Sequence, residues 1–370
     1  EQLEAIESVD GPMLIIAGPG SGKTFTLVER IVFLVTERKV SPESLFVVTF
    51  TEKAAQELTT RISNRLIEIG IDFNLHEMYL GTFHSICLRI LEEYREFTRL
   101  KRSFVLLDQF DQQYFLYQNL DPYYSIPNFE EILGKKESSR WLQSESLLKW
   151  LNKATEEALD PMLLIESGDQ AIEALGQCVK VYQEQLDTHN SLDFSGIQFE
   201  TLKLLESYPD VLHQIRSKIT YLMVDEYQDT NHIQSLLCEA LSSVHQRITV
   251  VGDDAQSIYG FRGASSDNIR NFPDVGHPTE LIKLEQNYRS TPQILNVANK
   301  LLQQSSSLYE KKLYTERCDS DLPALVPTLD QIEEAEFITQ YALHLREHQV
   351  EFRDMAVLFR NASDSYQLEL

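Results

Sequence analysis

The sequence has few features of secreted, zinc-binding or membrane proteins. Its four cysteines lie far apart and form no CxxC pair, so they indicate neither a disulfide framework nor a zinc site. Its apolar runs are much shorter than the roughly 20 residues that span a bilayer. No secretory signal or membrane segment is visible. These absences favour a protein of the reducing cytoplasm, without a membrane partner.

Positive charge is also scarce. The 33 basic residues face 57 acidic ones, and the net charge is -24. Because phosphate contacts need Lys and Arg, this balance argues against a nonspecific binder of polyanions, and any nucleic-acid site must be a local groove. The 370 residues, 42% of them hydrophobic, suffice for about two or three globular domains. The chain begins with Glu and not with Met, so we expect further residues beyond the ends.

Apolar runs alternate with helical patterns near the start of the chain, which predicts an α/β fold with a parallel sheet. Strands are predicted at 13–17 and 45–50, and a third is predicted to end at 81–84. Residues 103–216 then show long helical patterns with few strand signals, which indicates a helical insertion.

Strand patterns return after the helical stretch, at 219–224 and 248–251. These strands are predicted to complete the interrupted sheet. A second α/β domain is predicted to begin after 285–290, with a helix, a proline-marked linker, another helix and a strand at 355–359. Within the insertion, Asp193 is predicted to cap the helix that follows it.

A glycine-rich turn follows the first predicted strand and precedes a helical pattern, which is the context of a phosphate-binding loop. Glycines let backbone N–H groups turn toward phosphate oxygens, and the helix N-terminus adds positive potential. Lys23 is expected to reach the β and γ phosphates, and Thr24 to ligate magnesium. The strict pattern has glycine where Ala17 stands. The predicted nucleotide-binding loop comprises Ala17, Gly18, Pro19, Gly20, Ser21, Gly22, Lys23 and Thr24.

Two carboxylates, Asp225 and Glu226, end the predicted strand at 219–224. Magnesium prefers hard oxygen ligands, so we assign Asp225 to the metal. Glu226 can polarise the attacking water as a general base. An acidic pair at a strand end is also typical of a loop start or a helix cap, but in one sheet with a P-loop it predicts an NTPase. A P-loop fold serves kinases, motors, transporters and GTPases alike.

The surrounding residues make the class more specific. Residues 224–231 read VDEYQDTN, and residues 251–264 read VGDDAQSIYGFRGA. Here the chain closely resembles the UvrD/Rep/PcrA family of superfamily 1 DNA helicases, as motifs II and III. The resemblance continues at 49–55 as motif Ia, at 81–85 as motif Ib and at 286–290 as motif IV, and it covers nearly the whole chain.

This resemblance implies two RecA-like lobes with ATP in the cleft between them. The implied domains are residues 1–100 and 216–282 for the two parts of lobe 1A, 101–215 for the helical subdomain 1B, and 283–370 for the start of lobe 2A. The family's motifs V and VI, with a second γ-phosphate arginine, do not occur in these residues. We therefore expect a truncated second lobe, and residues 1–370 to bind ATP but hydrolyse it poorly.

For the nucleotide, the resemblance implies that Gln2 recognises adenine and that Tyr288 stacks on the base. It implies that Arg289 contacts the γ phosphate, where a guanidinium stabilises charge on the transferring phosphoryl group. Gln256 is implied to link the γ-phosphate state to the DNA groove. The expected catalytic residues are therefore Glu226, Gln256 and Arg289, and the expected cofactors are ATP and Mg²⁺.

For single-stranded DNA, aromatic faces stack on bases while polar and cationic groups hold phosphates. Phe50 fits a core role as well as a DNA role, and Tyr259 fits packing between domains as well as stacking. The family usually has Arg and Trp where Gly260 and Phe261 stand, which removes one cationic contact and leaves a smaller platform. The DNA-binding residues implied by the resemblance are Thr49, Phe50, Thr51, Thr82, His84, Tyr259, Phe261 and Arg262.

The implied activity is that of an ATP-dependent 3′ to 5′ DNA helicase or single-stranded DNA translocase in DNA repair or replication. The implied partners are single-stranded or partial duplex DNA and repair or replication proteins. Two alternatives stay open: the helicase subunit of a helicase-nuclease complex, which a nuclease domain after residue 370 would reveal, and a noncatalytic ATP- and DNA-binding module. A small-molecule kinase is disfavoured because no acceptor-binding motif occurs.

Overall fold

The computed structural model divides the chain into two compact units, residues 1–318 and 319–370, which are described separately. The residues that the structure describes are 1–71, 74, 77–133, 139–260, 263–272, 278–304 and 309–369.

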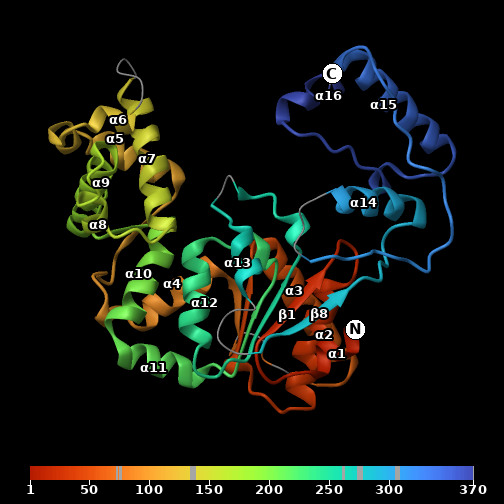
Figure 1. Cartoon of the computed structure of the whole chain (residues 1–370), viewed down its shortest axis with the longest axis horizontal. Helices are drawn as coiled ribbons and strands as arrows, with labels where there is room; N and C mark the ends of the chain where they lie inside the picture. Colours follow the sequence, from red (N-terminus) through yellow and green to blue (C-terminus); the bar gives the residue numbers. More distant parts are fainter. Residues whose placement is uncertain are drawn as a thin grey trace. The chain divides into compact units, whose positions relative to one another are not determined.

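Among these residues, the first unit is built on a six-stranded parallel sheet with the strand order β3-β2-β6-β7-β1-β8 (Figure 1). The sheet confirms the predicted α/β class, and β6 and β7 complete it after the interruption. The edge strand β8 was not predicted, and it pairs along the whole of β1. The strands are β1 (Met13–Ala17), β2 (Leu45–Thr49), β3 (Tyr79–Thr82), β6 (Tyr221–Val224), β7 (Ile248–Gly252) and β8 (Glu280–Leu284).

Helices cover both faces of this sheet, because successive strand residues point to opposite sides. In β1, Met13, Ile15 and Ala17 join the core under α1, α2 and α3. Leu14 and Ile16 join the core under α4, α10, α11, α12 and α13. These helices are α1 (Gln2–Glu7), α2 (Lys23–Thr36), α3 (Glu52–Glu68), α4 (Phe83–Glu93), α10 (Phe194–Ser207), α11 (Pro209–Lys218), α12 (His232–Ser242) and α13 (Ser266–Asn271).

Within the predicted helical insertion, the described residues of 107–186 form a body with its own apolar core, beside the sheet in Figure 1. The helices α10 and α11 of the predicted stretch 103–216 pack on the sheet instead. Two short parallel strands, β4 (Val105–Leu107) and β5 (Ser191–Asp193), pair where the chain enters and leaves this body. Asp193 caps α10 by accepting a hydrogen bond from Gly196 N, as predicted. The helices of the body are α5 (Gln109–Gln118), α6 (Phe129–Leu133), α7 (Arg140–Glu156), α8 (Pro161–Ile165) and α9 (Gln170–Thr188).

Two predicted strands end earlier than the apolar pattern suggested, because threonine caps start the next helix. Thr51 accepts a hydrogen bond from Ala54 N and begins α3, so β2 ends at Thr49. Thr82 accepts one from Ser85 N and begins α4, so β3 ends there. A side-chain acceptor at this position satisfies a free N–H of the first helical turn.

After β8, α14 (Pro292–Gln304) belongs to the first unit. The second unit contains α15 (Gln331–Glu347) and the short α16 (Tyr366–Glu369). The strand predicted at 355–359 is wrong: these residues take no strand conformation, and Leu358 is 94% exposed. A strand needs a hydrogen-bonding neighbour, and the described residues of this unit contain no other strand. In the described parts of the chain, no helix has the length and apolarity to cross a membrane.

Candidate nucleotide and nucleic-acid sites

The predicted phosphate-binding loop connects β1 to α2 at the carboxyl edge of the sheet. Gly20 has φ 73° and Gly22 has φ 88°, a left-handed conformation that glycine adopts without steric cost. The Ser21 hydroxyl donates to the Gly18 carbonyl over 2.7 Å and closes the turn. A Cβ at Gly20 would lie 2.7 Å from the side chain of Asn287, so the loop has room only for glycine there.

The phosphate loop and the loop after β6 meet at the carboxyl edge of the sheet. Lys23 Nζ lies 2.9 Å from Glu226 Oε2, and the Lys23 side chain is 11% exposed. Gln228 Nε2 also donates to Glu226 Oε2, over 2.9 Å, and to Asp229 Oδ2 over 3.2 Å. Lys23 and Glu226 thus form an ion pair at the mouth of the phosphate loop, with the lysine mostly buried and the glutamate about one-third exposed.

The carboxylate assigned to the metal is buried next to this ion pair. Burial, together with the charge of Glu226, raises the pKa of Asp225 to about 6, although Lys23 acts in the opposite direction. The same influences raise the pKa of Asp229 to about 6. A nearby cation would favour the charged form of both carboxyls, so this cluster suits a divalent ion brought by a nucleotide.

The residues present fit Mg²⁺ bound with a nucleotide. Thr24 follows Lys23 at the loop, and Asp229 Oδ1 is a buried oxygen for which the described residues provide no hydrogen-bond donor. Asp225 and Thr24 would supply oxygen ligands, and the phosphates and waters the rest. Across the described ranges, no group of three or more His, Cys, Asp or Glu side chains is placed to hold a metal alone.

The two residues expected to contact the adenine base, Gln2 and Tyr288, lie beside the phosphate loop. Gln2 Nε2 donates to the Ser21 carbonyl over 3.1 Å, and Tyr288 N donates to the Gly20 carbonyl over 2.9 Å. The Tyr288 hydroxyl lies 3.5 Å from Gln2 Oε1, and its ring is half exposed. A pocket of about 720 Å³ brings together Gln2, Pro19, Gly20, Gly22, Lys23, Thr24, Phe25, Glu57, Arg61, Glu226, Gln256, Tyr288 and Arg289.

Sequence reasoning missed a buried arginine that anchors the helix carrying Gln2. Arg30 of α2 is 1% exposed and donates from Nη1 to the Ala5 carbonyl over 2.7 Å and to the Ser8 carbonyl. Burial lowers its pKa to about 10. The carbonyls at the end of α1 have no partners within the helix, and the guanidinium satisfies them. The signal that could have revealed it is that Arg30 is a charged residue on the apolar face of α2.

Gln256 lines the nucleotide pocket and belongs to the loop after β7. Its Nε2 donates over 2.5 Å to Oδ2 of Asp253, which is fully buried. Asp253 N donates over 3.0 Å to Oε1 of Gln228, whose amide nitrogen holds Glu226. Gln256 and Glu226 are therefore linked by a continuous series of hydrogen bonds through Asp253 and Gln228.

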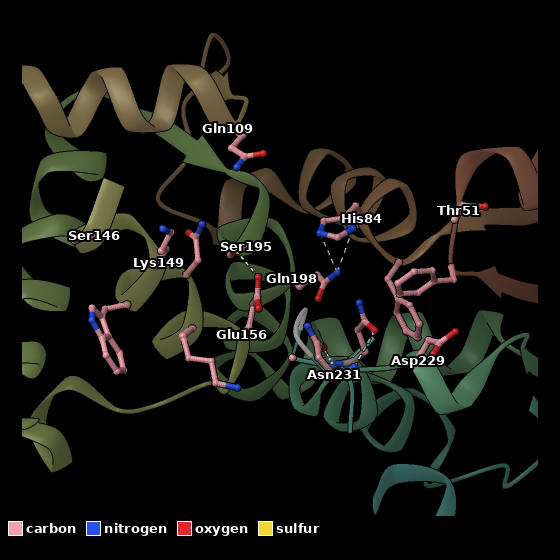
Figure 2. A pocket seen from close by; sticks show the side chains of 18 of the residues that line it. Thr51, His84, Gln109, Ser146, Lys149, Glu156, Ser195, Gln198, Asp229 and Asn231 are labelled. Atoms are coloured by element: carbon pink, nitrogen blue, oxygen red, sulfur yellow. Dashed lines mark hydrogen bonds between the residues drawn. The ribbon is translucent and has the colours of Figure 1, made fainter. Parts of the chain in front are cut away.

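A larger groove of about 1160 Å³ lies between the sheet edge and the helical body (Figure 2). His84 faces it, with the Gln198 amide nitrogen 3.1 Å from its Nε2. Burial lowers the pKa of His84, so its ring is neutral at neutral pH. The ring of Phe194 lies 5.5 Å from that of His84 and is 49% exposed.

The groove also receives four of the eight residues expected to bind DNA, namely Thr49, Phe50, Thr51 and His84. Thr49, Phe50 and Thr51 line it, and the Phe50 and Tyr259 rings lie 5.3 Å apart. Phe50 is half-buried, which fits both of its expected roles, packing and contact with DNA. Thr82 is buried and hydrogen-bonds to Glu52 and does not line the groove. The expected contacts Phe261 and Arg262 lie outside the described residues.

The opposite wall of the groove comes from the helical insertion, which sequence reasoning did not connect with the site. Trp150 of α7 is 48% exposed, and Lys149 and Lys153 stand on the same helix. Both lysines form ion pairs with glutamates four residues away. In the sequence, this spacing is typical of an ordinary solvated helix face. Only the packing of α7 beside α10 turns these side chains toward the groove.

Two family descriptions together match nearly the whole chain. The UvrD/REP helicase N-terminal domain matches residues 1–275, and the UvrD-like helicase C-terminal domain matches residues 282–370. Among curated proteins, the ATP-dependent DNA helicases PcrA of Staphylococcus epidermidis and Staphylococcus aureus are each 35% identical to the chain over all 370 residues. The chain spans about half the length of these relatives, 48% of each.

Proposed function

Since this chain belongs to the UvrD/REP helicase family, we propose that it is part of an ATP-dependent DNA helicase that translocates on single-stranded DNA from 3′ to 5′. ATP binds at the phosphate loop, and single-stranded DNA binds in the groove beside the helical body. The product of each catalytic cycle is ADP and phosphate.

One observation carries this proposal: a single loop after β6 serves both sites. Glu226 of this loop faces Lys23 in the nucleotide pocket, while Asp229 and Asn231 line the groove. Gln228 hydrogen-bonds to Glu226 and Asp229 at once. A displacement of the loop that follows nucleotide binding would therefore reach the DNA groove directly.

The side chains suggest how hydrolysis proceeds. In this structure Lys23 is held by Glu226, and the γ phosphate would draw Lys23 away as a stronger anion. Glu226 is then free to accept a proton from the water that attacks the γ phosphorus, while ADP leaves with the bridging oxygen. Arg289, exposed at the same pocket, stabilises the transferring phosphoryl group. Magnesium, held by Asp225 and Thr24, would neutralise phosphate charge.

Domain organisation and cellular role follow from the same proposal. We propose that residues 1–100 and 216–282 belong to lobe 1A, residues 101–215 to subdomain 1B and residues 283–370 to the start of lobe 2A, although α10 and α11 pack on the sheet and β8 crosses the bound at 283. The protein acts in DNA repair or replication in the cytoplasm, on single-stranded or partial duplex DNA and with repair or replication proteins.

The test is ATP hydrolysis by the complete protein with and without single-stranded DNA, followed by unwinding of duplexes with a 3′ or a 5′ single-stranded tail. We expect hydrolysis to be stimulated by DNA and unwinding to require the 3′ tail. Absence of stimulation would refute the helicase proposal, and unwinding from the 5′ tail alone would refute the direction.

Replacing Gln256 with alanine tests the link between the two sites. The change removes the hydrogen bond to Asp253 but leaves the phosphate loop intact. We expect the Kd for ATP to change by less than about twofold and the stimulation of hydrolysis by DNA to fall about tenfold or more. Titration with a fluorescent ATP analogue and steady-state hydrolysis measure the two effects. Normal stimulation would remove Gln256 from the coupling path.

Replacing Gly260 with arginine tests the groove. A Cβ at Gly260 meets no atom within 4 Å, so a long side chain has room. The change adds a cation to a groove-lining position, and we expect single-stranded DNA to bind several-fold more tightly. The slope of log affinity against log salt should steepen by about 0.7, the value for one added phosphate contact with a single strand. Gly260→Gln is the neutral control, and equal salt slopes for both variants would contradict the placement of DNA in this groove.

A further inference from the structure

A buried ion pair joins two loops that lie far apart in the sequence. Lys311, between α14 and the end of the first unit, places its Nζ against Oδ1 of Asp253 and 3.1 Å from Oδ1 of Asp254. The side chain of Lys311 is 2% exposed, that of Asp253 is fully buried and that of Asp254 is 8% exposed. Burying charges in this way is costly unless they are paired and hydrogen-bonded. The ammonium therefore holds both carboxylates in place.

The carboxylate of Asp253 is shared between Lys311 and the candidate sensor Gln256. Its Oδ1 contacts Lys311 and accepts from Ala255 N over 3.0 Å, while its Oδ2 accepts from Gln256 Nε2 over 2.5 Å. Without the ammonium, this buried carboxylate would lose its charge partner and would rotate. The rotation would move the acceptor that orients the Gln256 amide.

The segment that carries Lys311 also contacts the nucleotide site. Leu313 is 3% exposed and packs against Gly18 so closely that a Cβ on that glycine would clash with it. The next residue, Tyr314, accepts a hydrogen bond at its carbonyl from Asn287 N over 2.7 Å. Asn287 Nδ2 in turn donates to the Pro19 carbonyl. Residues 311–314 thus contact the phosphate loop, the loop that carries Arg289, and the two aspartates, Asp253 and Asp254, that precede Gln256.

We propose that Lys311 is a positioning residue that holds Asp253 in the orientation from which Gln256 couples nucleotide state to DNA. Because residues 311–314 contact both loops, a movement of the phosphate loop or of the loop that carries Arg289 shifts Lys311 and, with it, Asp253. The inference rests on the proposed function, because it assigns Lys311 a role in DNA-stimulated ATP hydrolysis. Lys311 itself lies outside the nucleotide pocket and the groove.

The test uses the complete protein with the substitutions Lys311→Gln, Lys311→Arg and, as a matched control, Lys312→Gln. Lys312 is exposed, and its contact with Glu285 uses only its backbone N–H. We expect Lys311→Gln to lower the DNA-stimulated kcat about tenfold or more while the KM for ATP stays within about twofold. Lys311→Arg keeps the positive charge and should recover most of the turnover, and Lys312→Gln should behave as wild type.

A double-mutant cycle with Gln256→Ala separates positioning from general damage to the fold. If Lys311 acts through Gln256, the double variant loses no more stimulation than Gln256→Ala alone, because interacting sites are not additive. Additive losses, a parallel rise in KM, or wild-type turnover in Lys311→Gln would each overturn the inference. A wild-type protein without DNA stimulation would instead refute the proposed function, and this inference with it. Binding of a fluorescent ATP analogue shows that each variant is folded.

Discussion

Replacing Lys23 with alanine is expected to reduce ATP hydrolysis to background, a fall of about 10²- to 10³-fold or more. Lys23 is the cation at the phosphate loop, and its Nζ lies 2.9 Å from Glu226 Oε2. Alanine removes the only side-chain charge that the loop can offer to the γ phosphate. The fold should survive, because Glu226 is about one-third exposed and regains water when its partner is lost. Steady-state hydrolysis at saturating single-stranded DNA measures the effect.

Lys180→Ala is the matched control for this experiment. Lys180 is exposed on α9 in the helical body, far along the chain from the phosphate loop. Its variant should hydrolyse ATP as fast as wild type does. Undiminished turnover in Lys23→Ala would overturn the assignment of the phosphate loop, whereas equal losses in both variants would indicate a general effect of lowering positive charge.

Replacing Glu226 with glutamine is expected to lower kcat by about 10²- to 10⁴-fold, the range for loss of a general base. Glutamine keeps the shape of the side chain but cannot accept the proton of the attacking water. It also removes the anion that holds Lys23 in the absence of nucleotide, so ATP should bind at least as tightly as to wild type. Single-turnover hydrolysis and titration with an ATP analogue separate the two effects.

Glu206→Gln, an exposed change at the end of α10, is the control for Glu226→Gln. It makes the same chemical change away from both sites, and its kcat should match that of wild type. A Glu226→Gln variant that binds ATP tightly but still turns over at the wild-type rate would show that another group accepts the proton.

The sequence predicted those parts of the fold and site that depend on local signals. The strand into the phosphate loop, the glycine-rich turn and the carboxylates after β6 are each specified within a few residues. The sequence placed the phosphate loop and the carboxylates in one parallel sheet, but it did not predict the ion pair between Lys23 and Glu226. The inserted helices were predicted because their apolar spacing has the helical period.

What the sequence could not show depends on contacts between distant residues. Lys311 looks like an ordinary surface lysine, and only folding brings it to Asp253. The strand β8 reads as a short apolar stretch, and its pairing with β1 decides that it joins the first sheet. The strand predicted at 355–359 had the right composition but has no described partner strand in its unit. Trp150 gave no local sign that it would line a groove.

The position of β1 in the sheet determines when the nucleotide site can first exist during synthesis on the ribosome. Met13 pairs on one side with Thr249 and on the other with Glu280. The strand β1 therefore has neither neighbour until residues 249 and 280 have been translated, and contacts of such sequence separation form late. Until then, the apolar strand that leads into the phosphate loop has two open edges, and open edges invite aggregation. A nascent chain of this protein is most vulnerable before β8 emerges, and a pause in translation before that point would lengthen the exposure.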